Sequence, residues 1–284
     1  ENTLILPREP ELSLRYQREY DNMWNHARDF DTASEDFAKA SIPEELSVDD
    51  PDQDALFTSK NFSVKEGSTT FKVTSSNTVA DALAAAIRSA KKSVHLASGH
   101  MRSRIVADAL KERVGQIEVK VYLDGQEFIS DGKSWDQKSE LEDCLADAAG
   151  DAKKKTECEA NDYLFGRELG EAGVDVRYKY YAYRWDFTYA PQMHHKYMVI
   201  DGETLYSGSY NLSDNAEHAT FENMMVLKGQ SASGIIAKFE KNFAGMFETG
   251  RDKLADLQKT IETADTIPIV FDSMALSSKE IDTL

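Results

Sequence analysis

The sequence predicts an α/β fold, and two observations carry this prediction. Residues 79–90, 93–98, 103–113 and 117–124 are predicted in succession as helix, strand, helix and strand, an order typical of a parallel βαβ unit. Farther along, the apolar runs 196–201 and 204–207 flank Gly202-Glu203, which indicates two antiparallel strands joined by a tight turn. With 284 residues, 41% of them hydrophobic, the chain can bury a substantial core.

The opening segment, residues 1–28, repeats the pattern of residues 222–252. Each copy begins with Glu-Asn and an apolar run, and each continues as a helix with apolar residues at i, i+4, i+7 and i+8. The matched positions are Tyr16, Tyr20, Met23 and Trp24 in the first copy and Phe239, Phe243, Met246 and Phe247 in the second. A repeat at this distance predicts duplicated domains, with two unrelated strand–helix units as the alternative.

Residues 31–67 are rich in Asp, Glu, Ser and Pro and have little hydrophobic period, which is typical of a linker. The elements predicted after residue 124 are helices at 140–149, 162–172 and 231–247, strands at 174–181 and 221–228, and a short turn or helix at 214–218.

Charge and cysteine content limit the function classes. Lys and Arg number 33 against 50 Asp and Glu, and the net charge of -17 disfavours non-specific wrapping of nucleic acid. No apolar run approaches the length of about 20 residues that spans a bilayer. No cluster of Cys, His and carboxylates has metal-ligand spacing, so we expect no catalytic zinc and no cofactor. Cys144 and Cys158 are either a disulfide or two thiols; a disulfide and the acidic surface would favour a secreted or periplasmic protein.

Residues 194–211 follow the pattern H-x-K-x4-D-x6-G-S-x-N. Because residues two apart on a strand face the same way, His194 and Lys196 should project together. The turn then brings Ser209 and Asn211 back toward the strand end that carries His194. An imidazole, a fixed cation and two neutral hydrogen-bonding groups around one small space suit a phosphate better than a carbonyl.

This pattern resembles the HKD motif of the phospholipase D superfamily, and Glu222-Asn223 resembles the Glu-Asn pair that follows the motif there. The resemblance covers roughly residues 75–250. It implies a mixed β-sheet flanked by helices, in a duplicated domain with a pseudo-twofold relation. It also implies a phosphodiesterase that works through a covalent phospho-histidine and needs no metal for chemistry.

The resemblance implies a role for each motif residue. His194 would be the nucleophile or the general acid, and Lys196 and Asn211 would bind the non-bridging phosphoryl oxygens. The remaining members of the motif are Ser209, which could add a hydrogen bond, Glu222, which would orient His194, and Asp201, which we expect to hold the hairpin together rather than to touch substrate.

In two-motif members of the family, a strand and a helix like those of residues 1–30 close each HKD domain. We therefore expect residues 1–30 to close an upstream HKD domain, residues 31–67 to be the linker, and residues 68–284 to be a C-terminal HKD phosphodiesterase domain. The expected partner is the upstream half or a second copy, which would supply the second histidine. The aromatic residues of the first helix would then be exposed in this chain alone.

Three residues just before the motif, Tyr181, Arg184 and Trp185, are candidate substrate contacts, because mixed cations and aromatics suit both single-stranded nucleic acid and a lipid headgroup layer. A half-buried strand is the alternative. His100 follows a strand that should end at the pocket, and could edge it. His195 should face away from His194, into the core. Phospholipid is the expected substrate, with DNA or RNA, or a catalytically incomplete phosphate-binding half, as the alternatives.

Overall fold

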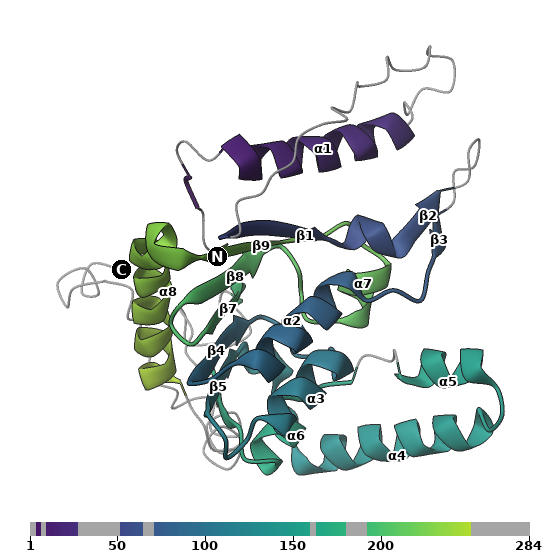
Figure 1. Cartoon of the computed structure of the whole chain (residues 1–284). Helices are drawn as coiled ribbons and strands as arrows, with labels where there is room; N and C mark the ends of the chain where they lie inside the picture. The colour runs from purple at the N-terminus through teal and green to yellow at the C-terminus, as the bar shows by residue number, and fades with distance from the viewer. Residues whose placement is uncertain are drawn as a thin grey trace, which may run out of the picture.

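The computed structural model of the chain describes residues 4–6, 10–27, 52–64, 71–159, 163–179 and 192–250. These residues build a seven-stranded sheet in the order β1-β9-β8-β7-β4-β5-β6, with helices on both faces (Figure 1). Its strands are β1 (Gln53–Phe57), β4 (Ser93–Ser98), β5 (Glu118–Leu123), β6 (Asp175–Tyr178), β7 (Lys196–Ile200), β8 (Thr204–Gly208) and β9 (Asn223–Lys228). A separate antiparallel pair consists of β2 (Phe62–Val64) and β3 (Phe71–Val73).

The sheet is mixed. Strands β4, β5 and β6 run parallel, whereas β7 pairs antiparallel with β4 and begins an antiparallel series through β8, β9 and β1. The helices are α1 (Pro10–His26), α2 (Thr78–Ser89), α3 (Arg104–Glu112), α4 (Asp131–Asp147), α5 (Ala152–Glu159), α6 (Gly166–Glu171), α7 (Asp214–His218) and α8 (Gly229–Thr249), with 3-10 turns η1 (Thr58–Asn61) and η2 (Gly125–Glu127). The predicted βαβ unit and hairpin are confirmed.

Strand alternation divides the core into two layers. On β7, Met198 and Ile200 pack with the layer under α2 and α3, while Tyr197 and Val199 pack with the layer under α8. The aromatic face predicted for the last helix fills this second layer, where Phe239 meets Tyr197 edge-on at 4.9 Å between ring centroids. Burial on both faces explains why β7 is apolar throughout after Lys196.

Helix α4 begins nine residues before the predicted start at residue 140, at Asp131. The Ser130 side chain accepts a hydrogen bond from the backbone N–H of Lys133 and caps the helix, a signal that the sequence analysis missed. Cys144 on α4 and Cys158 on α5 form a disulfide with 5.8 Å between their Cα atoms, which decides between the two alternatives. Across the described residues, no helix is both long enough and apolar enough to cross a bilayer.

The segment predicted as a linker contains an edge strand. Gln53–Phe57 forms β1, which pairs with β9 in the register Ala55↔Met225, and η1 and β2 follow it. The folded domain thus includes residues 53–64, well before residue 68. The strand alternates buried and half-buried positions, but Gln and Asp occupy two of its five residues, so composition alone indicated a linker.

Helix α1 packs on this edge strand (Figure 1). Arg15 forms an ion pair with Asp54 at 2.8 Å, and the ring of Tyr16 lies edge-on to Phe57 at 5.3 Å between centroids. The expectation that the aromatic residues of this helix are exposed is wrong for Tyr16 and Trp24, which are half-buried, but holds for Tyr20, which is 53% exposed. Residues 4–6 carry no strand assignment. The assignment of residues 1–30 to an upstream domain stays a prediction.

Candidate active site

The hairpin that carries the motif turns at Asp201 and Gly202, with φ angles of 57° and 68°. Both residue types tolerate this left-handed region, which a tight hairpin turn requires. The Asp201 carboxylate accepts hydrogen bonds from the backbone N–H groups of Lys91, Lys92 and Ser93 at 2.6–3.0 Å. Burial by itself raises the pKa of Asp201, but these three hydrogen bonds outweigh it, and the net pKa lies below the ordinary 3.8.

Asp201 therefore fastens the hairpin to the segment that leads into β4. It follows the carboxyl end of β7, whereas Lys196 begins that strand, so the length of the strand separates the two. Asp201 is not among the residues that line the pocket described below. The expected role of Asp201 in holding the hairpin agrees with these contacts.

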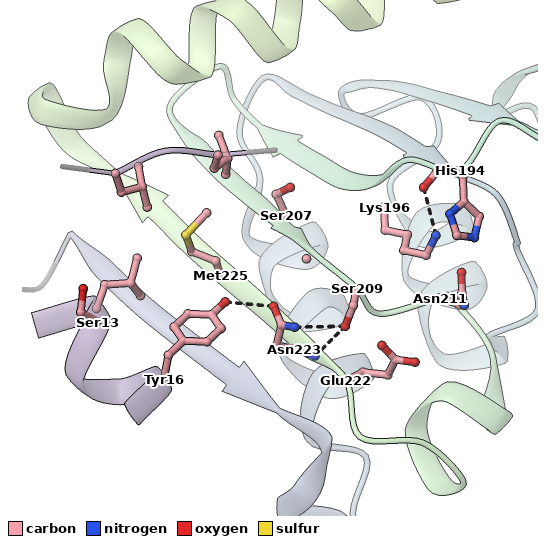
Figure 2. Close-up of a pocket in the computed structure, with 14 residues that line it drawn as sticks. Ser13, Tyr16, His194, Lys196, Ser207, Ser209, Asn211, Glu222, Asn223 and Met225 are labelled. Atoms are coloured by element: carbon pink, nitrogen blue, oxygen red, sulfur yellow. Dashed lines mark hydrogen bonds between the residues drawn. The ribbon is translucent and has the colours of Figure 1, made fainter. Parts of the chain in front are cut away.

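The other five residues with an expected role meet in one pocket with a volume of about 760 Å³. They are His194, Lys196, Ser209, Asn211 and Glu222. The remaining lining residues are Leu4, Leu6, Leu12, Ser13, Tyr16, Ser207, Gly208, Asn223 and Met225. Figure 2 shows His194, Lys196, Asn211 and Glu222 around one end of the pocket, and Tyr16, Ser13 and Met225 toward the other.

Lys196 is fixed in place beside His194. Its Nζ donates a hydrogen bond to the backbone carbonyl of His194 at 3.0 Å, and only 7% of the residue is exposed (Figure 2). Such a tethered ammonium loses little freedom when an anion binds. The pair thus presents a positive charge next to an imidazole, as the strand alternation predicted.

Two contacts position the segment that holds His194. The buried Asp124, just after β5, accepts a hydrogen bond from the backbone N–H of Met193 at 2.5 Å. On the other side, the backbone N–H of Gly99 donates to the carbonyl of His195 at 3.0 Å. A side chain at Gly99 would place its Cβ 2.9 Å from the Met193 carbonyl oxygen, so this close approach of two backbones requires glycine.

A hydrogen-bond chain crosses the floor of the pocket. The Tyr16 hydroxyl donates to Asn223 Oδ1 at 2.9 Å, and Asn223 Nδ2 donates to Ser209 Oγ at 3.1 Å (Figure 2). The backbone N–H of Asn223 also donates to Ser209 Oγ at 3.1 Å. Because Ser209 Oγ accepts both bonds, its own proton remains available for an acceptor in the pocket.

Asn211 and Glu222 complete the polar end. Asn211 Oδ1 is buried and accepts no hydrogen bond from the residues that the structure describes. The Glu222 carboxylate accepts a hydrogen bond from Thr220 Oγ1 at 2.9 Å and lies at the same end of the pocket as Asn211 and His194 (Figure 2). The orientation of His194 by Glu222 stays a prediction. What the geometry offers is a concave polar site with one imidazole and one cation.

Residues 83–247 match the family model described as "Cardiolipin synthase, PLD-like domain". The chain belongs to the phospholipase D superfamily. A stretch of 78 residues is 41% identical to the mitochondrial cardiolipin hydrolase of Chlamydomonas reinhardtii and covers 28% of this chain and 30% of that protein. The chain thus matches less than a third of the length of this curated relative.

Two solved structures resemble the phospholipase D chain described here. Nuc from Salmonella typhimurium, a phospholipase D family member, aligns with a TM-score of 0.44 at 16% identity, over 71% of this chain and 97% of Nuc. NucT from Helicobacter pylori aligns with a TM-score of 0.38 at 18% identity, over 61% of this chain and 89% of NucT.

His100 belongs to a neighbouring cluster rather than to the pocket lining. The buried Glu127 accepts hydrogen bonds from His100 Nδ1 at 2.9 Å, from Arg102 Nη2 at 2.9 Å and from the backbone N–H of Met101 at 3.1 Å. Burial raises the pKa of Glu127, but the bonds from His100 and Arg102 outweigh it, so the pKa lies below its usual range. The backbone of Arg102 donates to the carbonyl of Leu212 at 2.7 Å, which ties this cluster to the loop of Asn211. The predicted contact of His100 with substrate stays a prediction.

Three candidate substrate contacts, Tyr181, Arg184 and Trp185, lie outside the described residues. His195 is 8% exposed and lies edge-on to Tyr197, in the buried position expected for it. His218 contacts Asp214 through Nδ1 and the Ser76 carbonyl through Nε2, so both ring nitrogens are engaged outside the pocket.

Sequence analysis missed several residues of the phospholipase D pocket. Met225 lies two residues after Asn223 of the Glu-Asn pair on the predicted strand 221–228, and this spacing puts the two on one face, a signal that could have found Met225. Ser207 precedes the motif glycine and lies opposite Tyr197 across the hairpin. Tyr16 had no usable signal, because its repeat pattern indicated a different domain. Within the described residues, no group of three or more His, Cys, Asp or Glu side chains could hold a metal ion.

Proposed function

We propose that this chain is a phosphodiesterase of the phospholipase D type that acts on phospholipid through a phospho-histidine. One observation carries the proposal: His194, Lys196, Ser209, Asn211 and Glu222 come from separate positions in the sequence and line the same pocket. An imidazole beside a tethered ammonium is suited to a tetrahedral monoanion, since the cation offsets the charge that repels nucleophiles.

The reaction has two displacements. In the first, an imidazole nitrogen attacks phosphorus, a P–N bond forms, the P–O bond to the leaving alcohol breaks, and a second imidazole gives that oxygen a proton. In the second, the same second imidazole takes a proton from water, the hydroxide attacks phosphorus, and the P–N bond breaks. An alcohol in place of water would give transphosphatidylation. His194 supplies one of the two imidazoles.

The neighbouring residues stabilise the five-coordinate transition state. Lys196 Nζ and the amide of Asn211 would donate to the non-bridging oxygens, where negative charge develops. Ser209 can donate its hydroxyl proton to the same group, because its oxygen is already an acceptor for Asn223. Glu222 would accept a hydrogen bond from an N–H of His194 and so stabilise the positive charge that the imidazolium carries.

Lipid is favoured over nucleic acid by the walls of the pocket and by charge. The pocket that contains Lys196 is also lined by Leu4, Leu6, Leu12 and Met225, whereas a nucleic-acid groove combines cations with aromatic stacking surfaces. The net charge of -17 repels long polyanions. The relative at 41% identity over 78 residues is named a cardiolipin hydrolase, which agrees with a lipid substrate.

The reaction requires a second imidazole, whereas the H-x-K pattern occurs once in the sequence, at His194. We propose that it comes from a second HKD unit, either an upstream half or another copy of this chain. A phosphate-binding half without turnover is the outcome expected if no second unit engages.

The experiment compares substrates side by side. The full chain is incubated with phosphatidylcholine vesicles, with cardiolipin vesicles and with single-stranded DNA, and release of headgroup, phosphatidic acid or nucleotides is followed, with His194→Ala as the blank. Headgroup release that disappears in His194→Ala supports the proposal. Cleavage of DNA alone would replace it with a nuclease, and binding without turnover on every substrate would leave only the phosphate-binding role.

A further inference from the structure

The pocket continues beyond the phosphate-binding end into an apolar half. Tyr16 and Met225 lie toward this half (Figure 2), and Leu4, Leu6 and Leu12 line the same pocket. All but Met225 belong to the N-terminal segment, which the sequence assigned to another domain. The site residues of the motif account for none of these five, so the apolar half needs its own explanation.

The N-terminal segment presents its side chains to the pocket selectively. Leu4 and Leu6 are half-buried and line the pocket, whereas Ile5 between them is 85% exposed. This alternation is what an extended segment produces when one side faces a binding site. On α1, Leu12 is 4% exposed and lines the same wall.

The wall is anchored to the sheet. Arg15 pairs with Asp54 of β1 at 2.8 Å, and the Tyr16 hydroxyl donates to Asn223 of β9 at 2.9 Å (Figure 2). Burial raises the pKa of Tyr16 to about 12, so the hydroxyl keeps the proton that it donates. Tyr16 is thereby linked to the polar end, since Asn223 in turn donates to Ser209.

We propose that residues 4–6 and α1 build a subsite for the apolar arm of the substrate, the alkyl or acyl-glycerol chain that stays on phosphorus when the alcohol leaves. This inference rests on the proposed phosphodiesterase function and names the part of the chain that selects the substrate. An open apolar wall directly beside a phosphate site complements an amphipathic diester, because the wall removes the arm from water while Lys196 holds the phosphate. A nucleotide offers no such arm.

The test uses water-soluble diesters of one chemistry and different arm length. p-Nitrophenyl methyl, butyl and octyl phosphates lose the same p-nitrophenolate, followed by its absorbance, and the alkyl arm remains on phosphorus. Each methylene that enters an apolar subsite is worth about 0.8 kcal/mol, so kcat/KM should rise about threefold to fourfold per methylene until the subsite is filled. The double variant Leu4→Ser/Leu6→Ser should flatten this dependence, so that the methyl, butyl and octyl diesters are hydrolysed with similar kcat/KM.

Ile5→Ser is the matched control. It makes the same chemical change in the same segment, at a residue that faces away from the pocket, and should leave the dependence on arm length intact. Thermal melting of both variants checks that the fold is kept.

The outcomes separate the two proposals. Hydrolysis of no diester at all, by protein of intact fold, would overturn the proposed function and the subsite with it. Hydrolysis with no dependence on arm length, or a dependence that survives in Leu4→Ser/Leu6→Ser, would overturn the subsite and leave the phosphodiesterase standing. Equal flattening by Ile5→Ser would likewise overturn it, because the effect would then not come from the pocket wall.

Discussion

Asp124 Oδ2 lies 2.5 Å from the backbone nitrogen of Met193, and this bond fixes the residue immediately before His194. The other carboxylate oxygen accepts the backbone N–H of Gln126. Asn at this position can accept only one of the two bonds, so Asp124→Asn should loosen His194 and lower kcat by up to about 100-fold, with KM little changed.

A purely structural role would lower thermal stability without a selective effect on kcat. Asp124→Asn should therefore be measured by kinetics and by melting together. A variant that melts several degrees lower but keeps its kcat would contradict the positioning role.

The polar end of the pocket gives the second prediction. His194→Ala should abolish turnover, since no neighbouring side chain can replace an imidazole in covalent transfer or proton donation. Lys196→Ala and Asn211→Ala should each remove about 2.7–4 kcal/mol of transition-state stabilisation, or about 100-fold to 1000-fold in kcat. Near-normal rates in a verified preparation of His194→Ala would contradict the assignment.

Substitutions at Asp201 and Glu222 should distinguish a structural role from a catalytic one. Asp201→Asn weakens three charge-assisted bonds to the backbone and should lower the free energy of unfolding by about 1 kcal/mol, or about 2–4 °C in melting temperature. Because the folded-state pKa of Asp201 is depressed, its contribution is present above pH 3.8 and is lost as pH falls through the folded value. Glu222→Gln should instead lower kcat at an unchanged melting temperature. Reversed results would show that the two roles are exchanged.

A feature of the fold or the site could be predicted from the sequence when the residues that determine it lie close together in the chain. The helix at 78–89, the strand at 93–98 and the motif hairpin follow from periodicities within a dozen residues, and each was predicted within about one residue. The polar end of the pocket was predicted because strand alternation and one turn decide which motif side chains meet.

The rest depends on partners far away in the sequence. Strand β1 is stabilised by pairing with β9, and no sequence pattern within Gln53–Phe57 indicates that partner. Tyr16 enters the pocket because Arg15 meets Asp54 and Tyr16 meets Asn223. Asp124 was passed over as the end of a strand, since a lone acidic residue after a strand does not indicate which backbone it will hold.

His95 gives a prediction about pH. Its Nδ1 lies 2.6 Å from Glu240 on α8 and its Nε2 lies 2.8 Å from Glu118 on β5, while its ring stacks on Phe243. Burial lowers the pKa of His95, but the hydrogen bonds to Glu240 and Glu118 outweigh it, and the net pKa lies above 6.5. Since the folded pKa is raised, this stabilisation is fully present below pH 6.5 and is lost as pH rises through the folded value.

The difference in melting temperature between the original chain and His95→Gln should therefore be largest at about pH 6 and shrink toward about pH 9. His218, whose pKa is also raised by its bond to Asp214, is present in both proteins and cancels from the comparison. A difference that grows as pH rises would contradict the ion-pair account.

The last prediction concerns the second imidazole. Two His194 side chains from two copies can face one phosphate only across a twofold interface, in which the same surface of each copy meets its counterpart. Light scattering on the purified chain should then report a dimer. The original chain and His194→Ala can be mixed in different proportions and allowed to exchange subunits. The activity of each mixture should then be proportional to the square of the fraction of unmutated subunits, because one defective partner disables the shared site. A monomer with full activity, or an activity that falls linearly with the fraction of unmutated subunits, would contradict pairing. His100, the histidine next to Gly99, would then be the candidate source of the second imidazole.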